Sequence, residues 1–175
     1  MKTLLTLSAL AAAVVPAVAQ AQASAPAKTC TGAAPALPSE LAAWPNRTKL
    51  TAAVDPAGLG AAHIAPGKAI DARLSSGTKV HFGDGPGRAK DVGDNAGIFA
   101  FSVDQPGTYR VALGSGGWVD VLEGGKAVES SAHGHGPECS GIVKMVDFPL
   151  KAGEHVLQLE GSKEATVGIL IARLP

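Results

Sequence analysis

The sequence predicts an all-β fold, an antiparallel β-sandwich with a jelly-roll-like order of strands. Two observations predict it. Short runs in which apolar and polar residues alternate recur from residue 48 to the C-terminus, and this period of two is the pattern of a half-buried strand. The chain also holds 22 glycines and 12 prolines, which indicates many turns and short strands rather than long helices. Short strands separated by turn residues are typical of sandwiches and barrels.

Residues 1–23 are expected to form a secretory signal peptide. Lys2 gives a positive start, the apolar run Leu4–Val18 has the length of a signal h-region, and small residues suited to cleavage follow it. The run contains Pro16 and is too short for a bilayer, so an uncleaved anchor is only the alternative interpretation. No later stretch approaches this apolar length. We therefore expect a periplasmic or secreted bacterial protein with no membrane span after signal cleavage.

Removal of the signal peptide leaves about 150 residues, the size of one domain. Lys2 is the only charged residue removed, so 14 basic side chains remain against 15 acidic ones, a net charge of −1. Proteins that bind nucleic acid usually carry a basic face, and we expect no nucleic-acid partner. Residues 24–47 are rich in Ala, Pro and Ser and predict an irregular arm ahead of a sandwich domain at 48–175.

The first half of the domain has the weaker strand signals. Within the arm, Glu40–Trp44 can form one helical turn, which Pro45 ends. Strands are predicted at Thr48–Val54, Lys68–Leu74 and Thr78–Phe82, with turns at Asp55–Gly58 and Ser75–Gly77. A long polar, Gly-rich loop is predicted at Gly83–Gly97.

From residue 97 the strand signal is strong. Phe99, Phe101 and Val103 alternate with small or polar residues and predict a half-buried strand. Gly124-Gly125 predicts a hairpin turn. The remaining strands are predicted at Tyr109–Leu113, Trp118–Leu122, Ala127–Ser130, Ile142–Leu150, His155–Glu160 and Thr166–Leu174.

Export and a count of two cysteines together predict a disulfide. Cys30 and Cys139 are the only intramolecular pair, and their bond would close a loop of roughly 110 residues, for which chain entropy gives at most about 4.7 kcal/mol. We expect the bond to hold the N-terminal arm beside the loop that contains Cys139. The alternative is that both thiols are metal ligands, which an oxidising compartment disfavours.

The stretch Ser131–Ser140 reads S-A-H-G-H-G-P-E-C-S and is the first candidate for a site. His133 and His135 are two residues apart and can reach one metal ion, with Glu138, His81, His63 or a free Cys139 as further ligands. Imidazoles suit Zn or Cu, and two histidines with a carboxylate suit Fe(II). Two histidines alone are an incomplete site. The alternative interpretation is a polar loop with no cofactor, held by the disulfide and shaped by its glycines.

Two other chemistries have candidate residues in this sequence. Trp118 can stack on a sugar ring, and the alternative is that it belongs to the core beside Val119. Ser131 and Ser140 flank the histidines, with Asp120 and Asp147 as acids, but no nucleophile elbow or triad motif accompanies them.

Three segments carry a resemblance to a known family. Trp118–Leu122, the hairpin Gly124–Ser131 and Phe148–Leu157 resemble, in this order, the bacterial pre-peptidase C-terminal domain over roughly residues 97–172. The resemblance implies a jelly-roll-like sandwich with an accessory or binding role, and it brings no catalytic residues. Within it, His155 stands where the family usually has an aromatic residue.

The loop Ala132–Cys139 is extra relative to that family pattern. Short exported chains with an H-G-H-G-P-x-C stretch are also similar to proteins labelled homogentisate 1,2-dioxygenase. The true dioxygenase is a much longer chain of the cupin type, and its iron ligands have no assigned positions here.

The function expected from these observations is that of a small exported, non-catalytic binding or accessory protein. Its ligand or partner is expected to be a metal ion, a glycan or another envelope protein. The alternative is a metal-dependent enzyme, specifically a non-haem iron dioxygenase that uses His133 and His135.

Overall fold

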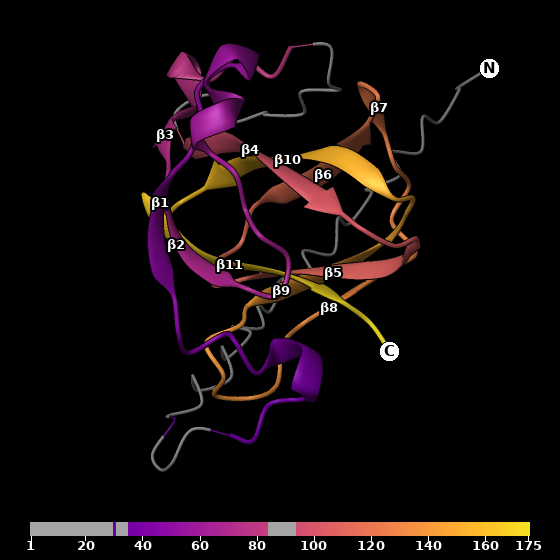
Figure 1. The fold of residues 1–175 in the computed structure, drawn as a ribbon. Coiled ribbons are helices and arrows are strands. Elements are labelled where there is room, and N and C mark those ends of the chain that lie inside the picture. Colours follow the sequence, from indigo (N-terminus) through magenta and orange to yellow (C-terminus); the bar gives the residue numbers. More distant parts are fainter. Residues whose placement is uncertain (1–29, 31–34, 84–93) are drawn as a thin grey trace, which may run out of the picture. The chain divides into compact units, whose positions relative to one another are not determined.

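A computed structural model of the protein describes Cys30 and residues 35–83 and 94–175 (Figure 1). The predicted signal peptide and most of the predicted Gly-rich loop lie outside the described residues. The chain divides into a segment Met1–Thr31 and a body Gly32–Pro175. All helices and strands that follow belong to the body. Within the described residues, no helix has the length and apolar character needed to cross a membrane.

The body is an all-β sandwich of two sheets, which confirms the predicted fold class. Sheet A has the strand order β1-β2-β11-β5-β9-β8, and sheet B has the order β3-β4-β10-β6-β7. Figure 1 shows β4, β10 and β6 as one layer above β11, β5 and β9. All strand pairs are antiparallel except β1 with β2, which is parallel. The strands are β1 (Thr48–Thr51), β2 (Ala69–Arg73), β3 (Ser75–Ser76), β4 (Asn95–Val103), β5 (Gly107–Leu113), β6 (Trp118–Glu123), β7 (Lys126–Ala127), β8 (Ala132–Gly134), β9 (Lys144–Leu150), β10 (Gly153–Ser162) and β11 (Thr166–Arg173).

The main core lies between the two sheets and is built from alternating positions. On β4, Phe99 and Phe101 are fully buried, and in the register of sheet B Phe99 pairs with Leu157 of β10. Leu157 pairs in turn with Val121 of β6, so one row of apolar side chains crosses three strands. Full burial of a side chain of this size contributes roughly 1.5–3 kcal/mol relative to exposure, so rows of this kind fix which face of each strand points inward.

A second, smaller core covers the outer face of sheet A. Leu170 and Ala172 of β11 point away from the main core. They pack with Leu41, the last residue of the short 3₁₀ helix η1 (Ser39–Leu41), and with Trp44, which follows this helix. A Cβ atom on Gly168 would lie 3.0 Å from the Trp44 ring, so glycine gives the indole room against the strand. The part of the predicted irregular arm around residues 39–44 is therefore packed against the sandwich.

Four local predictions differ from the structure. The prediction of a strand at Thr78–Phe82 is wrong, because the 3₁₀ helix η3 (Gly77–Lys79) occupies the start of this segment. The turn predicted at Asp55–Gly58 continues into a longer 3₁₀ helix, η2 (Pro56–Ala61), which Asp55 caps by accepting a hydrogen bond from the Gly58 N–H. The other two differences are the short strands β3 and β8, where a turn and a loop were predicted. Short segments of this kind take their structure from the sheet edge or turn they join rather than from their own pattern.

Candidate functional site

Trp118 opens β6 on the face opposite to the main core. Val119 and Val121 point into the sandwich, so the alternation of the strand turns Trp118 and Asp120 to the other face. The Trp118 side chain is 48% exposed. The interpretation of this residue as part of the core is therefore wrong, and the interpretation as a surface aromatic holds.

Two charged side chains fix the Trp118 indole. Its Nε1 donates a hydrogen bond of 2.9 Å to Oδ2 of Asp120, which is 7% exposed. The Lys144 ammonium of β9 lies 5.6 Å from the ring centroid and donates to the carbonyl oxygen of Gly117 at 2.7 Å. Cation–π attraction of this type contributes about 0.5–2 kcal/mol. The aromatic ring is thus exposed and at the same time held in one orientation.

The Lys144 ammonium is partly withdrawn from water. This burial lowers the pKa of Lys144 from its ordinary value, and the nearby Asp120 carboxylate opposes the shift by favouring the charged form. Trp118, Asp120 and Lys144 therefore form one electrostatically coupled group. Trp118 and Asp120 come from β6 of sheet B, and Lys144 comes from β9 of sheet A.

A groove of about 290 Å³ runs beside the exposed indole. Its wall combines the Trp118 ring and Phe148 with the polar residues Asp120, Glu129 and Ser130. A rigid aromatic face next to a few hydrogen-bonding groups is the arrangement that binds an amphipathic ring such as a pyranose. We call this surface the Trp118 groove.

The sequence predicted Trp118 but missed Lys144 and the role of Asp120 in this group. A signal for Asp120 was present, because residues two apart on a strand share a face. No signal in the sequence could pair Lys144 with Trp118, since they lie on strands of different sheets.

The histidines predicted as metal ligands lie at the edge of sheet A. His133 is exposed on β8, where it pairs with Val146 of β9, and His135 is exposed just beyond the strand. The Nδ1 of His135 lies 2.9 Å from the Val143 carbonyl oxygen. A carbonyl only accepts, so this contact assigns the proton to Nδ1 and leaves the lone pair of Nε2 for a ligand.

The further ligands predicted for this site do not complete it. Glu138 is exposed in the same loop, whereas His81 follows η3 and its backbone N–H donates to Val54, next to sheet B. Within residues 30, 35–83 and 94–175, no group of three or more His, Cys, Asp or Glu side chains is placed to hold a metal ion. The metal site at His133 and His135 stays a prediction.

Cys139 is not available as a thiol, because it forms the predicted disulfide with Cys30. Its backbone φ of 61° is the one positive value at a non-glycine residue in the described part of the chain. Around it, the Ser140 hydroxyl donates to the Pro137 carbonyl at 2.6 Å and accepts from the Ile142 N–H at 3.1 Å. The alternative in which both cysteines bind a metal is therefore wrong.

The serines considered for hydrolysis are engaged in structural contacts. The hydroxyls of Ser131 and Ser140 both donate to backbone carbonyls, of Asp147 and Pro137. The Asp147 carboxylate accepts two hydrogen bonds of 2.8 Å from Arg110, and this pairing raises the pKa of the Arg110 guanidinium. Ser131, Ser140 and Asp147 therefore hold the fold together through these hydrogen bonds.

A different serine lies in a polar cluster that the sequence did not indicate. The Ser102 hydroxyl donates to Oε1 of Glu154, and Nε2 of His63 lies 3.3 Å from the same hydroxyl oxygen. In a catalytic triad the histidine stands between the nucleophile and the acid. Here the serine stands in the middle, so the cluster does not have the geometry of a triad.

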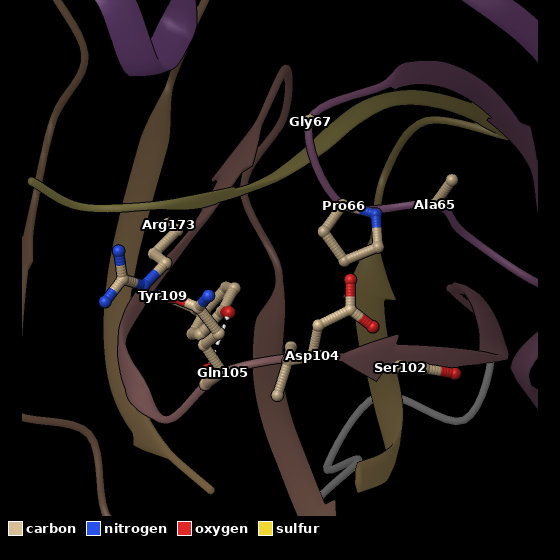
Figure 2. A pocket seen from close by; sticks show the side chains of 9 residues that line it. Ala65, Pro66, Gly67, Ser102, Asp104, Gln105, Tyr109 and Arg173 are labelled. Carbon is tan, nitrogen blue, oxygen red and sulfur yellow. Dashed lines mark hydrogen bonds between the residues drawn. The ribbon is translucent and has the colours of Figure 1, made fainter. Parts of the chain in front are cut away.

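Ser102 also borders an open pocket of about 490 Å³, shown in Figure 2. The Tyr109 hydroxyl at its centre donates to the carbonyl oxygen of Gln105 at 2.9 Å, so it braces the turn. Figure 2 shows the Arg173 guanidinium and the Asp104 carboxylate on opposite sides of Tyr109. These charges do not converge on one point, and the pocket is a weaker candidate than the Trp118 groove.

His155, at the start of the predicted strand His155–Glu160, is 2% exposed. Its ring stacks on Phe101 with centroids 5.3 Å apart, and its Nδ1 lies 3.1 Å from the Gly153 carbonyl oxygen. It fills an aromatic position of the core.

No protein-family model matches the chain, and no curated protein matches it either. The resemblance to the pre-peptidase C-terminal domain, like the fainter one to proteins labelled homogentisate 1,2-dioxygenase, stays a prediction.

Proposed function

We propose that the protein is an exported binding or accessory module whose Trp118 groove binds a glycan. The observation that carries this proposal is the Trp118 indole, which is 48% exposed and yet fixed by Asp120 and Lys144. An aromatic ring held rigidly at the surface loses little conformational entropy on binding, which favours affinity.

The chemistry of the groove supports a sugar as its ligand. A pyranose presents an apolar face of C–H groups and a rim of hydroxyls. The indole offers an apolar platform, while Glu129 and Ser130 offer hydrogen-bonding groups at the wall of the groove. The disulfide supports export, because such bonds persist in oxidising compartments such as the periplasm. A glycan of the bacterial envelope would therefore share a compartment with the protein.

The test is a binding screen on immobilised neutral and amino-sugar oligosaccharides, followed by intrinsic tryptophan fluorescence with each bound oligosaccharide. The chain has two tryptophans, and Trp44 is 3% exposed, so a ligand-induced change reports on Trp118. We expect saturable binding that Trp118→Ala weakens at least about tenfold. The substitution removes the stacking of the sugar ring on the indole, and stacking of a nucleobase on an aromatic side chain, the comparable contact, is worth about 1–3 kcal/mol.

Val143→Ala is the matched control. Val143 is the other large apolar side chain that is exposed in the described part of the chain, at 46%. Its truncation removes surface hydrophobicity without touching the aromatic group, so it should leave the affinity unchanged. Equal losses in both variants, or no saturable binding to any oligosaccharide, would overturn the proposal.

The orientation of His135 favours a second candidate function, the binding of a transition metal. Its Nδ1 contact to the Val143 carbonyl is the type of contact that orients a metal-ligating histidine. The test is elemental analysis of the protein, followed by titration with Zn, Cu or Fe(II). Stoichiometric binding that is lost in the His133→Ala, His135→Ala double variant would support a metal module or the iron enzyme. Weak, non-stoichiometric binding would rule out both the metal module and the iron enzyme.

A further inference from the structure

A groove of about 630 Å³ lies at the β1 edge of sheet A, on the opposite side of the strand order from β8. Ile70 and Ala72 of β2 point into the main core, so Asp71 and Arg73 stand on the outer face. Their neighbours on β1 and β11 stand on the same face and line the groove.

The strand register places an arginine between two threonines. Arg73 pairs with Thr51 on one side and with Thr166 on the other. Neighbouring strands are about 4.8 Å apart, so Thr51 and Thr166 lie on either side of Arg73 in one row, and all three residues line the groove. Lys49 stands in the next row, about 6.6 Å along β1, within reach of its long side chain.

The charge at this groove is positive. Lys49 and Arg73 are both exposed, and neither side chain has an ion-pair or hydrogen-bond partner among residues 30, 35–83 and 94–175. The nearby carboxylate, Asp71, accepts from Nε of Arg47 at 2.7 Å. The groove therefore holds two cations, Lys49 and Arg73, and one carboxylate, Asp71, which is already paired with Arg47.

This excess is local, because the whole chain has no net charge. A concave surface of one sign raises the local concentration of ligands with the opposite sign. The donors are of two kinds: a planar guanidinium that can hold two oxygens at once, and hydroxyls and an ammonium that add single bonds. This set matches a tetrahedral dianion better than a single carboxylate.

We propose that the groove formed by Lys49, Thr51, Arg73 and Thr166 is a second binding site, for a phosphate group. In this assignment Arg73 holds two phosphate oxygens, the threonine hydroxyls donate to the same group, and Lys49 supplies further positive charge. The proposal is independent of the glycan site, which lies on β6 of the other sheet.

The experiment titrates isotope-labelled protein with inorganic phosphate in a phosphate-free buffer of low ionic strength, because salt screens such contacts. A parallel arm measures binding to phosphatidylcholine vesicles with and without phosphatidic acid, which carries the same chemical group on a surface. We expect saturable shifts of the Thr51, Arg73 and Thr166 amide signals, or binding only to the vesicles with phosphatidic acid. The first result identifies a soluble phosphate as the ligand, and the second a membrane-borne phosphate.

Arg73→Gln should weaken the observed binding about tenfold, since it removes charge-assisted hydrogen bonds. Arg73→Lys keeps the charge but not the planar fork and should give an intermediate loss. Lys79→Gln, which removes an exposed cation of η3, is the matched control and should change binding little. Thermal unfolding of each variant shows that it is folded.

Two results would overturn the assignment. One is a phosphate affinity weaker than about 10 mM together with no preference for phosphatidic acid. The other is a loss in Lys79→Gln equal to that in Arg73→Gln, which would show that general charge and not this groove attracts the anion.

Discussion

The indole Nε1 of Trp44 donates a hydrogen bond of 3.0 Å to the carbonyl oxygen of Ser140, 96 positions further along the chain. Trp44 is 3% exposed, and its ring also lies against Gly168 of β11. One side chain near the N-terminus thus ties the loop after β8 to the outer face of sheet A.

Trp44→Phe should lower the free energy of unfolding by about 1–3 kcal/mol, because the Ser140 carbonyl loses its donor and part of the ring volume is lost. Denaturant unfolding monitored by circular dichroism measures the change. Val143→Ala, at an exposed position, should stay within about 0.5 kcal/mol of the wild type. A Trp44→Phe protein as stable as this control would show that the contact contributes nothing.

Gly97 of β4 packs closely against Ala52, which follows β1. A Cβ atom at this position would lie 2.3 Å from the Cβ of Ala52, which is itself buried. Gly97→Ala should therefore destabilise the fold by about 1–3 kcal/mol through overpacking. Gly60→Ala is the control, because its added Cβ meets nothing within 4 Å. The same denaturation measurement compares the two, and equal midpoints would contradict the prediction.

The Cys30–Cys139 disulfide closes a long loop, so its removal should release chain entropy in the unfolded state. The double variant Cys30→Ala, Cys139→Ala is expected to lose about 2–4 kcal/mol of stability. A thiol assay on the unreduced, unfolded wild type should find no reactive thiol. Detection of two thiols would show that the bond does not form in the cell.

The titration of Lys144 links the Trp118 groove to pH. In the folded protein the pKa of Lys144 is lowered below 10.5, its ordinary value. At a pH between the folded and the unfolded pKa, the unfolded chain therefore holds a proton on Lys144 that the folded chain has released. Stability should therefore rise with pH across that window, and Lys144→Met should remove the rise.

The Asp120 carboxylate opposes this shift, so Asp120→Asn should lower the Lys144 pKa further. Nitrogen-detected NMR of the lysine ammonium follows the titration directly. Glycan binding should weaken in the same pH range, because the cation above the Trp118 ring is lost. A Lys144 pKa that does not move in Asp120→Asn would show that the two groups are not coupled.

The pattern of the strands could be predicted where one face of each is buried. β4, β5, β6 and β11 were expected within a few residues of their observed bounds, because a core-facing row imposes a period of two. β3 and β8 were missed. Each is two or three residues long and exists through pairing with one neighbour, which a local pattern does not reveal.

The candidate sites could also be predicted only in part from the sequence. Trp118 and the histidines could be singled out because their side chains carry recognisable chemistry. Whether Trp118 was exposed depended on which face of β6 met the other sheet, and its Lys144 partner depended on how the sheets pack. The cationic groove had no sequence signal at all, since Thr51, Arg73 and Thr166 are aligned only by register.

The sequence by itself determined the fold class and the disulfide partners, because both follow from composition, from periodicity and from a choice of only two cysteines. Only the tertiary structure decided that Trp118 faces outward, that Lys144 lies above its ring and that Arg73 stands between two threonines. The physical reason is that periodicity reports which residues prefer burial, whereas a site depends on which distant strands become neighbours, and that is settled when the two sheets pair and pack.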